Sequence, residues 1–282
     1  MKKPLALAIS AAALAFTSAA LADDPKEGGV VNTIIQPEPP GLVLGMVQNA
    51  PTRTVSGNIY EGLLRYSTDL EPMPQLAESW EVSDDGRTYT FHLREGVTWH
   101  DGEAFTAEDV VFSADVFHRE LNPSARAVLQ HVESIEATDD HTVVFTLTQP
   151  FGPFLLSFEA GTFTMVPEHL YAGTDFRNNE HNDHPIGTGP FKFDNWERGT
   201  VIELVKNEEY YEEGLPYLDG VNWHVIPDGA SRAVAFENET IDVLPSGTVE
   251  NFDIPRLAEM DNVCMTEEGH EYFSPFAMLW MN

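Results

Sequence analysis

The side chains most able to bind a metal lie in the segment from residue 180 to residue 184. This segment, Glu180-His-Asn-Asp-His184, combines two imidazoles with two carboxylates, and both groups are ligands of transition metals. Around a metal-bound water, such a set could hydrolyse an amide or an ester. A metal cage usually needs distant ligands as well, and the surroundings are polar, as in an exposed loop. We therefore expect solvated side chains and no metal site, with a metal-dependent hydrolase using His181 and His184 as the alternative.

Other catalytic patterns are missing from the sequence. There is no Gly-x-Ser-x-Gly elbow and no His-Glu-x-x-His helix, the motifs of serine and zinc hydrolases. Cys264, the only cysteine, lacks an activating context and is expected to be a small buried residue. His100, in Trp-His-Asp-Gly, is expected to be a turn residue and not a ligand or base. We predict no catalytic residues, no cofactor and no enzymatic activity.

The segment Gly187-Thr-Gly-Pro190 has the composition of an anion-binding loop. It lacks the spacing of a phosphate loop, and a strand pattern follows it where a phosphate loop would lead into a helix. Glycine also permits two backbones to approach closely. A tight backbone crossing is therefore the favoured explanation of these glycines.

Two hairpins and a helix are predicted around these segments. Asp85-Gly86 lies between alternating runs, and Glu136–Leu147 repeats the pattern around a second Asp-Asp turn, which predicts two similar hairpins in one antiparallel sheet. Tyr89, Phe91 and Leu93 should share one face of the second strand. The helix is expected to begin at Thr106, with Asp109 completing a capping box. Its apolar stripe comprises Val110, Ala114, Phe117 and Leu121.

The remaining pattern alternates short strands, loops and helices. Three prolines between Gln36 and Gly41 remove backbone donors and predict a loop directly after the first strand. The other expected elements are strands at Gly28–Gln36, Val201–Val205 and Ile241–Leu244, helices at Thr54–Arg65 and Ser231–Glu239, and irregular chain at Leu70–Gln75.

The stretch from Ala77 to Ser113 resembles the family 5 bacterial extracellular solute-binding proteins, which serve peptide and nickel ABC importers. The shared motifs include Ala-Glu-Ser-Trp, Asp-Asp-Gly, Thr-Tyr-Thr-Phe-His-Leu-Arg, Trp-His-Asp-Gly and Phe-Thr-Ala-Glu-Asp-Val-Val-Phe. Further matches follow at Met165–Tyr171, Pro185–Phe193 and Asn207–Tyr211. The resemblance covers almost all of residues 28–282 and the N-terminal portion of such a protein.

The resemblance implies an α/β fold of the periplasmic-binding-protein type II kind. A mixed β-sheet lobe would carry an inserted smaller α/β subdomain, and the second lobe would be missing. The expected boundaries are a signal peptide at 1–22, the start of lobe I at 23–62, the inserted subdomain at 63–180, the return to lobe I at 181–270, and the start of a truncated lobe II at 271–282.

The resemblance also implies the function. The chain would capture di- or oligopeptides in the periplasm and deliver them to the transmembrane subunits of an ABC permease, working as a monomer. Nickel, haem or another small solute remains open as the ligand. The loop after the first strand faces the cleft in this family, so the expected ligand contacts are Gln36, Glu38, Pro39, Pro40 and Gly41. Arg126, in the segment Ser124–Gln130, is a second candidate.

The two ends of the chain carry further signals. Lys2 and Lys3, the apolar run Leu5–Phe16 and the small residues before Asp23 are typical of a secretory signal cleaved after Ala22. The last seven residues, Phe276–Asn282, are mostly apolar. They lead us to expect a truncated chain with an exposed apolar strand, low solubility and weak ligand binding when it is expressed alone.

Charge excludes one class of partner. The sequence has 46 acidic and 15 basic residues, a net charge of −31, which is incompatible with binding the phosphates of a nucleic acid. The acids are spread along the chain. This distribution favours an acidic, solvating surface suited to high salt, and so a saline habitat, over a surface that collects cations.

Overall fold

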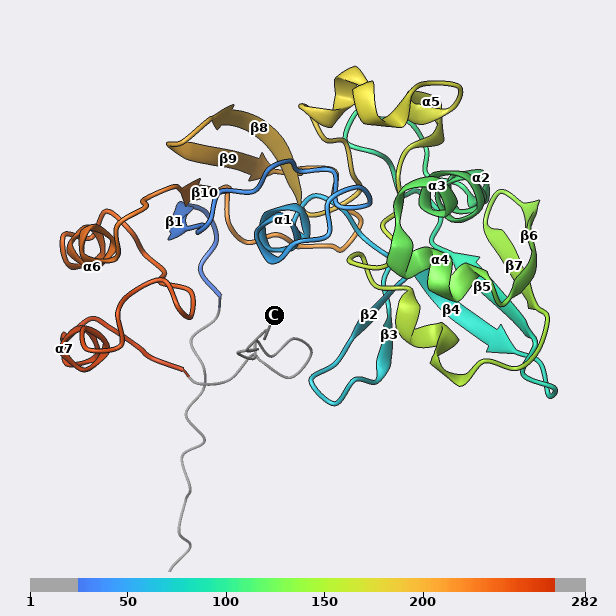
Figure 1. Cartoon of the computed structure of the whole chain (residues 1–282), viewed down its shortest axis with the longest axis horizontal. Coiled ribbons are helices and arrows are strands. Elements are labelled where there is room, and N and C mark those ends of the chain that lie inside the picture. The colour runs from blue at the N-terminus through green and yellow to red at the C-terminus, as the bar shows by residue number, and fades with distance from the viewer. Residues whose placement is uncertain (1–24, 267–282) are drawn as a thin grey trace, which may run out of the picture.

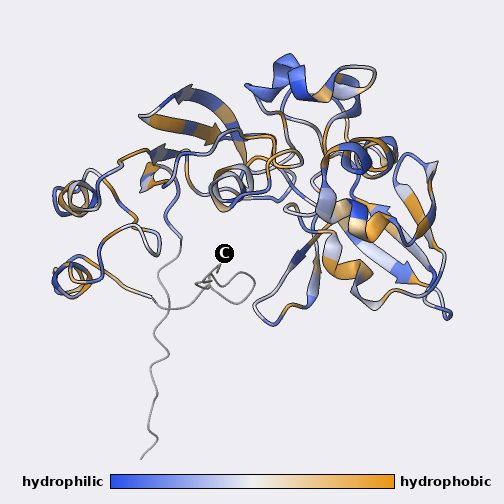
Figure 2. Cartoon of the chain, viewed as in Figure 1, coloured by the Kyte–Doolittle hydropathy of each residue, from blue (hydrophilic) through white to orange (hydrophobic). Residues whose placement is uncertain are grey.

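A computed structural model describes residues 25–266, which form two four-stranded sheets with separate hydrophobic cores (Figure 1). The predicted signal peptide and the apolar segment Phe276–Asn282 lie outside the described residues. Within residues 25–266 no helix is both long and apolar enough to cross a bilayer. Along the strands, apolar residues alternate with polar ones (Figure 2), so each sheet buries one side against the rest of the chain.

The first sheet is mixed, as the resemblance led us to expect. Its order is β1-β10-β9-β8, with β1 and β10 parallel and the other neighbours antiparallel. Helix α1 and the neighbouring loops contribute Val55, Ile59 and Tyr60 to its core. The strands and helix are β1 (Val30–Ile34), β8 (Phe191–Glu197), β9 (Val201–Lys206), β10 (Gly220–His224) and α1 (Ala50–Ser56).

The second sheet contains both predicted hairpins. Its order is β4-β5-β7-β6 and every neighbouring pair is antiparallel, which confirms the prediction of one shared sheet. Tyr89, Phe91 and Leu93 are buried on one face, where Phe91 packs with Phe145 and Phe158. The strands are β4 (Ala77–Val82), β5 (Thr88–Leu93), β6 (Val132–Asp139) and β7 (Thr142–Leu147).

A continuous helical segment from Ala107 to Leu121 packs against both cores. It comprises α2 (Ala107–Val111), a π-helical stretch η1 (Phe112–His118) and α3 (Arg119–Leu121). The predicted capping box is confirmed, because Asp109 Oδ2 accepts the Thr106 backbone N–H at 2.9 Å. The predicted stripe is buried throughout. Its members divide between the two cores: Val110 and Ala114 belong to the core of the second sheet, and Phe117 and Leu121 to that of the first.

The core of the second sheet draws its residues from Leu63 to Met165, whereas Val166, Tyr171 and Phe176 pack into the core of the first. The other elements are β2 (Leu64–Tyr66), β3 (Pro72–Pro74), α4 (Pro123–Leu129), η2 (Gly152–Ser157), α5 (Glu168–Tyr171), η3 (Phe176–Asn178), η4 (Glu180–Asn182), α6 (Gly229–Glu237) and α7 (Ile254–Ala258).

Three expected elements are wrong in place or kind. The helix expected at Thr54–Arg65 begins at Ala50 and ends at Ser56, because Asn49 caps it by accepting the Thr52 N–H at 2.9 Å; β2 follows. The chain expected to be irregular at Leu70–Gln75 forms β3, which pairs with β2. The strand expected at Ile241–Leu244 is reduced to a single bridge between Thr33 and Val243.

The expectation that Cys264 is buried is also wrong, because its side chain is exposed. Cys264 follows α7 in a segment, 261–266, that has no regular structure and is almost entirely exposed. Cys264 belongs to neither of the two cores of the described residues.

Candidate functional site

The carboxyl ends of the parallel strands β1 and β10 meet at one edge of the first sheet. Ile34 pairs with His224, His224 with Val201, and Val201 with Glu197. The loop Gln36–Gly41, the chain after β10 and the β8–β9 turn therefore lie along the same edge, which we call the carboxyl edge. Ligands of open α/β sheets bind outside the carboxyl ends of the strands, which makes this edge the candidate site.

Glu38 fastens the loop Gln36–Gly41 to the β8–β9 turn. Its Oε1 accepts the Trp196 indole N–H at 2.8 Å and the Gly199 backbone N–H at 3.0 Å. Pro39 beside it is buried, whereas Gln36 and Pro40 are exposed. Thr52 of α1 donates its hydroxyl to the Gly41 carbonyl at 2.8 Å. Glu38 and Gly41 thus hold the loop in place, while Gln36 and Pro40 face solvent.

A pocket of about 310 Å³ opens beside the β8–β9 turn. Arg198 and Trp196 both line it. The exposed Arg198 guanidinium carbon lies 3.3 Å from the ring centre of Trp196, a stacking geometry favourable to cation–π attraction. Arg198 takes part in none of the ion pairs found among residues 25–266. The N–H donors of its guanidinium group are therefore available to bind a carboxylate. The pocket is lined by Asp183, His184, Phe193, Asp194, Asn195, Trp196 and Arg198.

The other side of β1 is flanked by the segment around Val243. Asp242 donates its N–H to the Asn32 carbonyl at 2.8 Å, and Thr33 donates its hydroxyl to the Val243 carbonyl at 3.1 Å. Arg232 of α6 is buried, and its guanidinium binds backbone carbonyls on either side of this segment, those of Thr248, Ile226 and Pro227. A buried guanidinium thereby fixes the chain that borders the carboxyl edge.

Arg126 lies elsewhere. It is exposed on α4, beside the second sheet (Figure 1). Its guanidinium donates to the carbonyls of Glu120 at 2.8 Å and Arg119 at 3.3 Å. These contacts stabilise the end of the preceding helix. The structure therefore does not bring Arg126 together with the loop Gln36–Gly41.

The histidines of the segment 180–184 are partly or fully exposed. His184 packs its ring edgewise on Phe193 at 5.6 Å. Among residues 25–266 no group of three or more histidine, cysteine, aspartate and glutamate side chains is placed to hold a metal ion.

The crossing predicted at Gly187–Pro190 is confirmed. A Cβ on Gly187 would lie 1.9 Å from the Ile59 carbonyl oxygen, and one on Gly189 would lie 2.7 Å from that of Asn58. Backbone hydrogen bonds join the two segments here, such as Gly189 N–H to the Ile59 carbonyl at 2.9 Å. His100 binds the same crossing through its ring nitrogen Nε2, 2.9 Å from the Gly189 oxygen. Burial lowers the pKa of His100 to about 4, so its ring is neutral at physiological pH.

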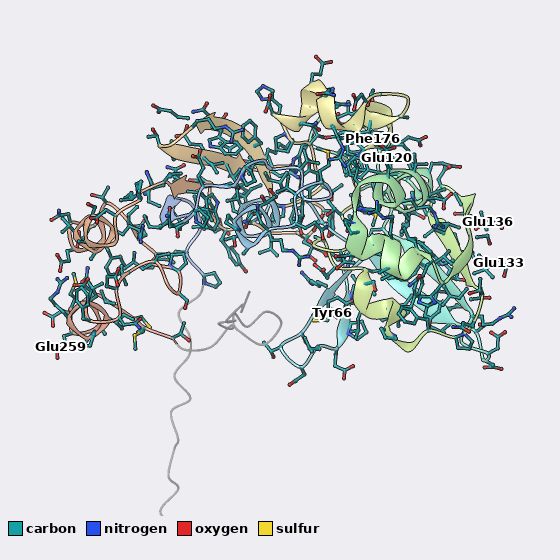
Figure 3. All side chains as sticks on the ribbon, viewed as in Figure 1. Tyr66, Glu120, Glu133, Glu136, Phe176 and Glu259 are labelled. Carbon is teal, nitrogen blue, oxygen red and sulfur yellow. The ribbon has the colours of Figure 1, made fainter. Side chains whose placement is uncertain are left out.

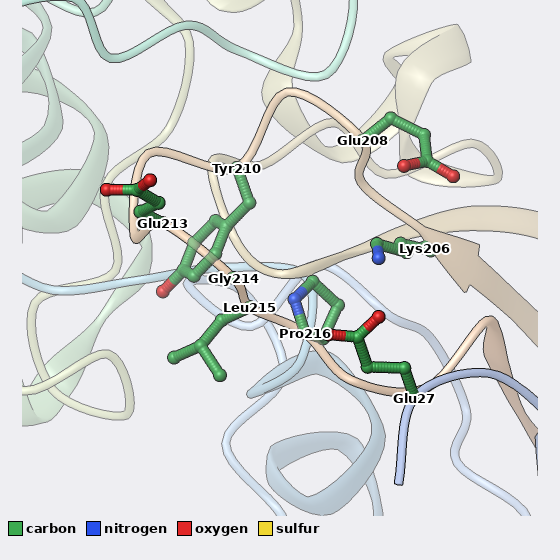
Figure 4. A pocket seen from close by; sticks show the side chains of 8 residues that line it. All are labelled: Glu27, Lys206, Glu208, Tyr210, Glu213, Gly214, Leu215 and Pro216. Carbon is green, nitrogen blue, oxygen red and sulfur yellow. The ribbon is translucent and has the colours of Figure 1, made fainter. Parts of the chain in front are cut away.

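A second pocket, of about 360 Å³, lies at the amino ends of β1 and β10 (Figure 4). It faces away from the carboxyl edge, because Lys206 ends β9 and Pro216 precedes β10. Its lining combines three carboxylates with one ammonium and the ring of Tyr210: Glu27, Lys206, Glu208, Tyr210, Glu213, Gly214, Leu215 and Pro216. It is therefore separate from the candidate site.

Several residues of the edge carried no signal in the sequence. Trp196 and Glu38 are 158 positions apart, and no local pattern links them. Arg198 comes just after a strand pattern, at a place where the sequence predicts only a turn. Arg232 lies on a helix, where an arginine is expected to face solvent.

Known proteins are similar to this chain in both sequence and fold. Residues 71–281 match bacterial extracellular solute-binding proteins, family 5 Middle. The oligopeptide-binding protein AppA of Bacillus subtilis is 33% identical over 83% of this chain and 42% of its own. Its structure with a nonapeptide has a TM-score of 0.76 at 28% identity, covering 85% of this chain and 47% of that one.

Two further structures are similar. One is the periplasmic binding protein DppA of Helicobacter pylori with the peptide STSA (TM-score 0.75, 30% identity, 84% of this chain and 50% of that one). The other is NikZ of Campylobacter jejuni with Ni(L-His) (TM-score 0.71, 27% identity, 83% of this chain and 46% of that one).

The matched residues include the whole second sheet and strands β8, β9 and β10 of the first. The similar structures share the type II periplasmic-binding-protein fold expected from the sequence. The chain spans about half the length of the curated relatives it matches. It belongs to the bacterial extracellular solute-binding proteins of family 5.

Proposed function

We propose that the protein captures short peptides in the periplasm and delivers them to the permease of an ABC importer. Family membership over residues 71–281 carries this proposal. Peptides are the ligands named for the similar structures of DppA and AppA. A signal peptide cleaved after Ala22 exports the protein, and it acts as a monomer without catalysing a reaction.

In the proposed mechanism the carboxyl edge forms one wall of the ligand site and a second lobe forms the other. Extended peptides bind through their backbone groups, as an added strand does. Gln36 and Pro40 contact the ligand from the exposed side of the loop. Glu38 and Gly41 shape the loop, because their hydrogen bonds already lie within the protein, and Pro39 is buried. Arg126 remains a candidate contact on the inserted subdomain, whose boundaries we place at 63 and 180.

Arg198 is the group most suited to an anionic end of the ligand. Its guanidinium is exposed, stacked on Trp196 and outside every ion pair of the described residues. A carboxylate could accept two parallel N–H bonds from it. Glu38 and Trp196 would then link the loop to the β8–β9 turn, and Arg198, stacked on Trp196, would bind the ligand.

Uptake by the source organism tests this function. Deleting the gene should abolish or strongly reduce the uptake of isotope-labelled di- and tripeptides, and restoring the gene should recover it. Nickel uptake in the same cultures is the control and should not change. Peptide uptake that stays at the parental level would contradict the proposal.

One alternative has a specific observation in its favour. NikZ, which is similar over 83% of this chain, was solved with Ni(L-His). If this protein binds a metal complex, the deletion strain should lose nickel uptake and keep peptide uptake. The two ligand classes therefore give opposite results in one experiment.

A further inference from the structure

Glu61 is a carboxyl group buried where the two cores meet. Only 1% of the residue is exposed. Tyr60, before it, belongs to the core of the first sheet, and Leu63, just after it, belongs to that of the second. The Glu61 carbonyl also accepts the Met165 backbone N–H at 3.0 Å. Its side chain therefore occupies the junction between the two sheets.

Four side chains contact this carboxyl group. Oε1 accepts the amide of Gln75 at 3.1 Å and the hydroxyls of Tyr210 and Tyr211 at 2.9 Å each. Oε2 accepts the Thr188 hydroxyl at 2.9 Å, its one hydrogen-bond partner among residues 25–266. Gln75 leads into β4 of the second sheet, whereas Thr188 and the tyrosines flank β8 and β9 of the first. The carboxyl group thus joins segments from both sheets.

Charged groups around the cluster do not contact Glu61 directly. Arg94 lies 5.4 Å from the ring centre of Tyr211 and donates to the Gln75 carbonyl. Arg65 pairs with Glu212 at 3.1 Å. His100, beside the Gly187–Pro190 crossing, is neutral because burial lowers its pKa. Among the described residues Glu61 therefore has hydrogen-bond partners but no ion pair.

The two carboxyl oxygens of Glu61 differ in their hydrogen-bond partners, and this difference decides which oxygen can carry a proton. Oε1 is surrounded by three donors and suits the carbonyl oxygen of a neutral acid. Oε2 faces a hydroxyl, which can accept a hydrogen bond as readily as it donates one. A proton on Oε2 would reverse only the bond to Thr188. The neutral acid and the ionised carboxylate can both keep all four contacts, but the ionised form places a charge in a buried site where no cation among the described residues contacts it.

We propose that Glu61 is a proton-sensitive latch that holds the two sheets together when protonated and loosens their junction when ionised. The charge gains free energy by reaching water, and it can reach water only if the segments that carry Gln75, Thr188 and the tyrosines move apart. The response would couple the position of the inserted subdomain to the pH outside the membrane.

The direction of the pKa shift of Glu61 agrees with this proposal. Burial raises its pKa from 4.5 to about 7, against the smaller opposing effect of its four hydrogen bonds. A carboxyl group with a raised pKa stabilises the closed junction in full below pH 4.5. This stabilising contribution is lost as the pH rises through about 7. The loosening should therefore develop between mildly acidic and mildly alkaline pH.

Thermal unfolding of Glu61→Gln tests the latch. Glutamine imitates the neutral acid, because its carbonyl can accept from the three donors and its amide can donate to Thr188. The Tm of the variant minus that of the unaltered protein should rise by roughly 5 °C between about pH 5 and about pH 8. Glu78→Gln, which changes an exposed acid of β4, controls for the charge and should give the same difference at both pH values.

If the Tm difference between Glu61→Gln and the unaltered protein stays constant across this pH range, the proposal is overturned.

Infrared spectroscopy of the unaltered protein provides a second readout that needs no stable variant. The stretching band of a protonated carboxyl group should be present near pH 6 and vanish by about pH 8. Its absence at pH 6 would mean that Glu61 is already ionised, which also contradicts the latch.

Discussion

Single residues at the crossings of the chain determine how the two sheets meet. Gly187 and Gly189 let the chain pass against Asn58 and Ile59, and Glu61 binds side chains on both sides of the same junction. At the opposite end of the first sheet, Glu38 fixes the loop that borders the candidate site. These residues act through close backbone approach and through buried polar contacts.

Gly187→Ala should therefore destabilise the protein. The added Cβ would lie 1.9 Å from the Ile59 carbonyl oxygen, so the backbone has to shift, at a cost of about 2–3 kcal/mol in the free energy of unfolding. Denaturant unfolding measures this loss. Gly152→Ala is the matched control, since nothing lies within 4 Å of the Cβ position there, and its effect should stay below about 1 kcal/mol. Equal effects of the two substitutions would contradict the close crossing.

Glu38 and Trp196 should be energetically coupled. A double-mutant cycle with Glu38→Ala and Trp196→Phe should give a coupling free energy of about 1 kcal/mol or more, because the indole N–H donates to a carboxylate. The pair Glu38→Ala with Trp80→Phe is the control, since Trp80 lies on β4 in the other sheet. If the two cycles show the same coupling, Glu38 does not anchor the loop through Trp196.

The elements differ in how far their own sequence determines them. The hairpins are set by short turn signals such as Asp85-Gly86, where Gly86 adopts a φ of 67°, and by the alternation of β5. The helix from Ala107 is set by its capping box. In contrast, β3 carries two prolines and forms only because the short strand β2 pairs with it. A pairing between separate segments of this kind leaves no mark in local periodicity.

The same distinction applies to the candidate site. The loop Gln36–Gly41 was predictable because three prolines follow a strand pattern. Its contacts were not, since the partner of Glu38 lies on β8 and was brought there by the folding of the first sheet. Arg126 has the residue type of a ligand contact, yet its guanidinium binds the end of α3. The residues that contact a ligand remain a prediction.

Asp109→Ala should weaken the start of the shared helical segment. Asp109 accepts N–H groups from Thr106 at 2.9 Å, Glu168 at 3.0 Å and the Trp99 indole at 3.3 Å, so its loss leaves several donors without a partner. We expect a loss of about 2–3 kcal/mol in the free energy of unfolding. Asp115→Ala removes an exposed acid of η1 that pairs with Arg119 and should cost less than about 1 kcal/mol. A loss for Asp109→Ala no larger than for Asp115→Ala would show that the cap is unimportant.

At the scale of the whole molecule, negative charge dominates the exterior. The acids are distributed over separate elements, with Glu120, Glu133, Glu136 and Glu259 exposed on α3, β6 and the end of α7 (Figure 3). The sequence predicted this spread from the positions of its 46 acids. Such a surface repels itself and stabilises the folded state less at low ionic strength.

Salt should therefore stabilise the protein. Screening shortens the Debye length from about 10 Å at 0.1 M to about 3 Å at 1 M, so the Tm should rise by several degrees when sodium chloride is raised over this range. Tetramethylammonium chloride at the same concentrations tests whether screening is responsible, and it should give a similar rise. A Tm that falls with both salts would show that ion pairs outweigh repulsion.

The proposed function is peptide binding without chemical conversion of the peptide. The most direct measurement is a thermal shift of the protein purified from its source, with a mixture of di- to pentapeptides in one arm and divalent metals, with and without chelator, in the other. We predict a higher Tm with peptides, peptides recovered intact by mass spectrometry, and no effect of the chelator. Chelator-sensitive hydrolysis of the peptides, or stabilisation by metal alone, would contradict peptide binding as the function.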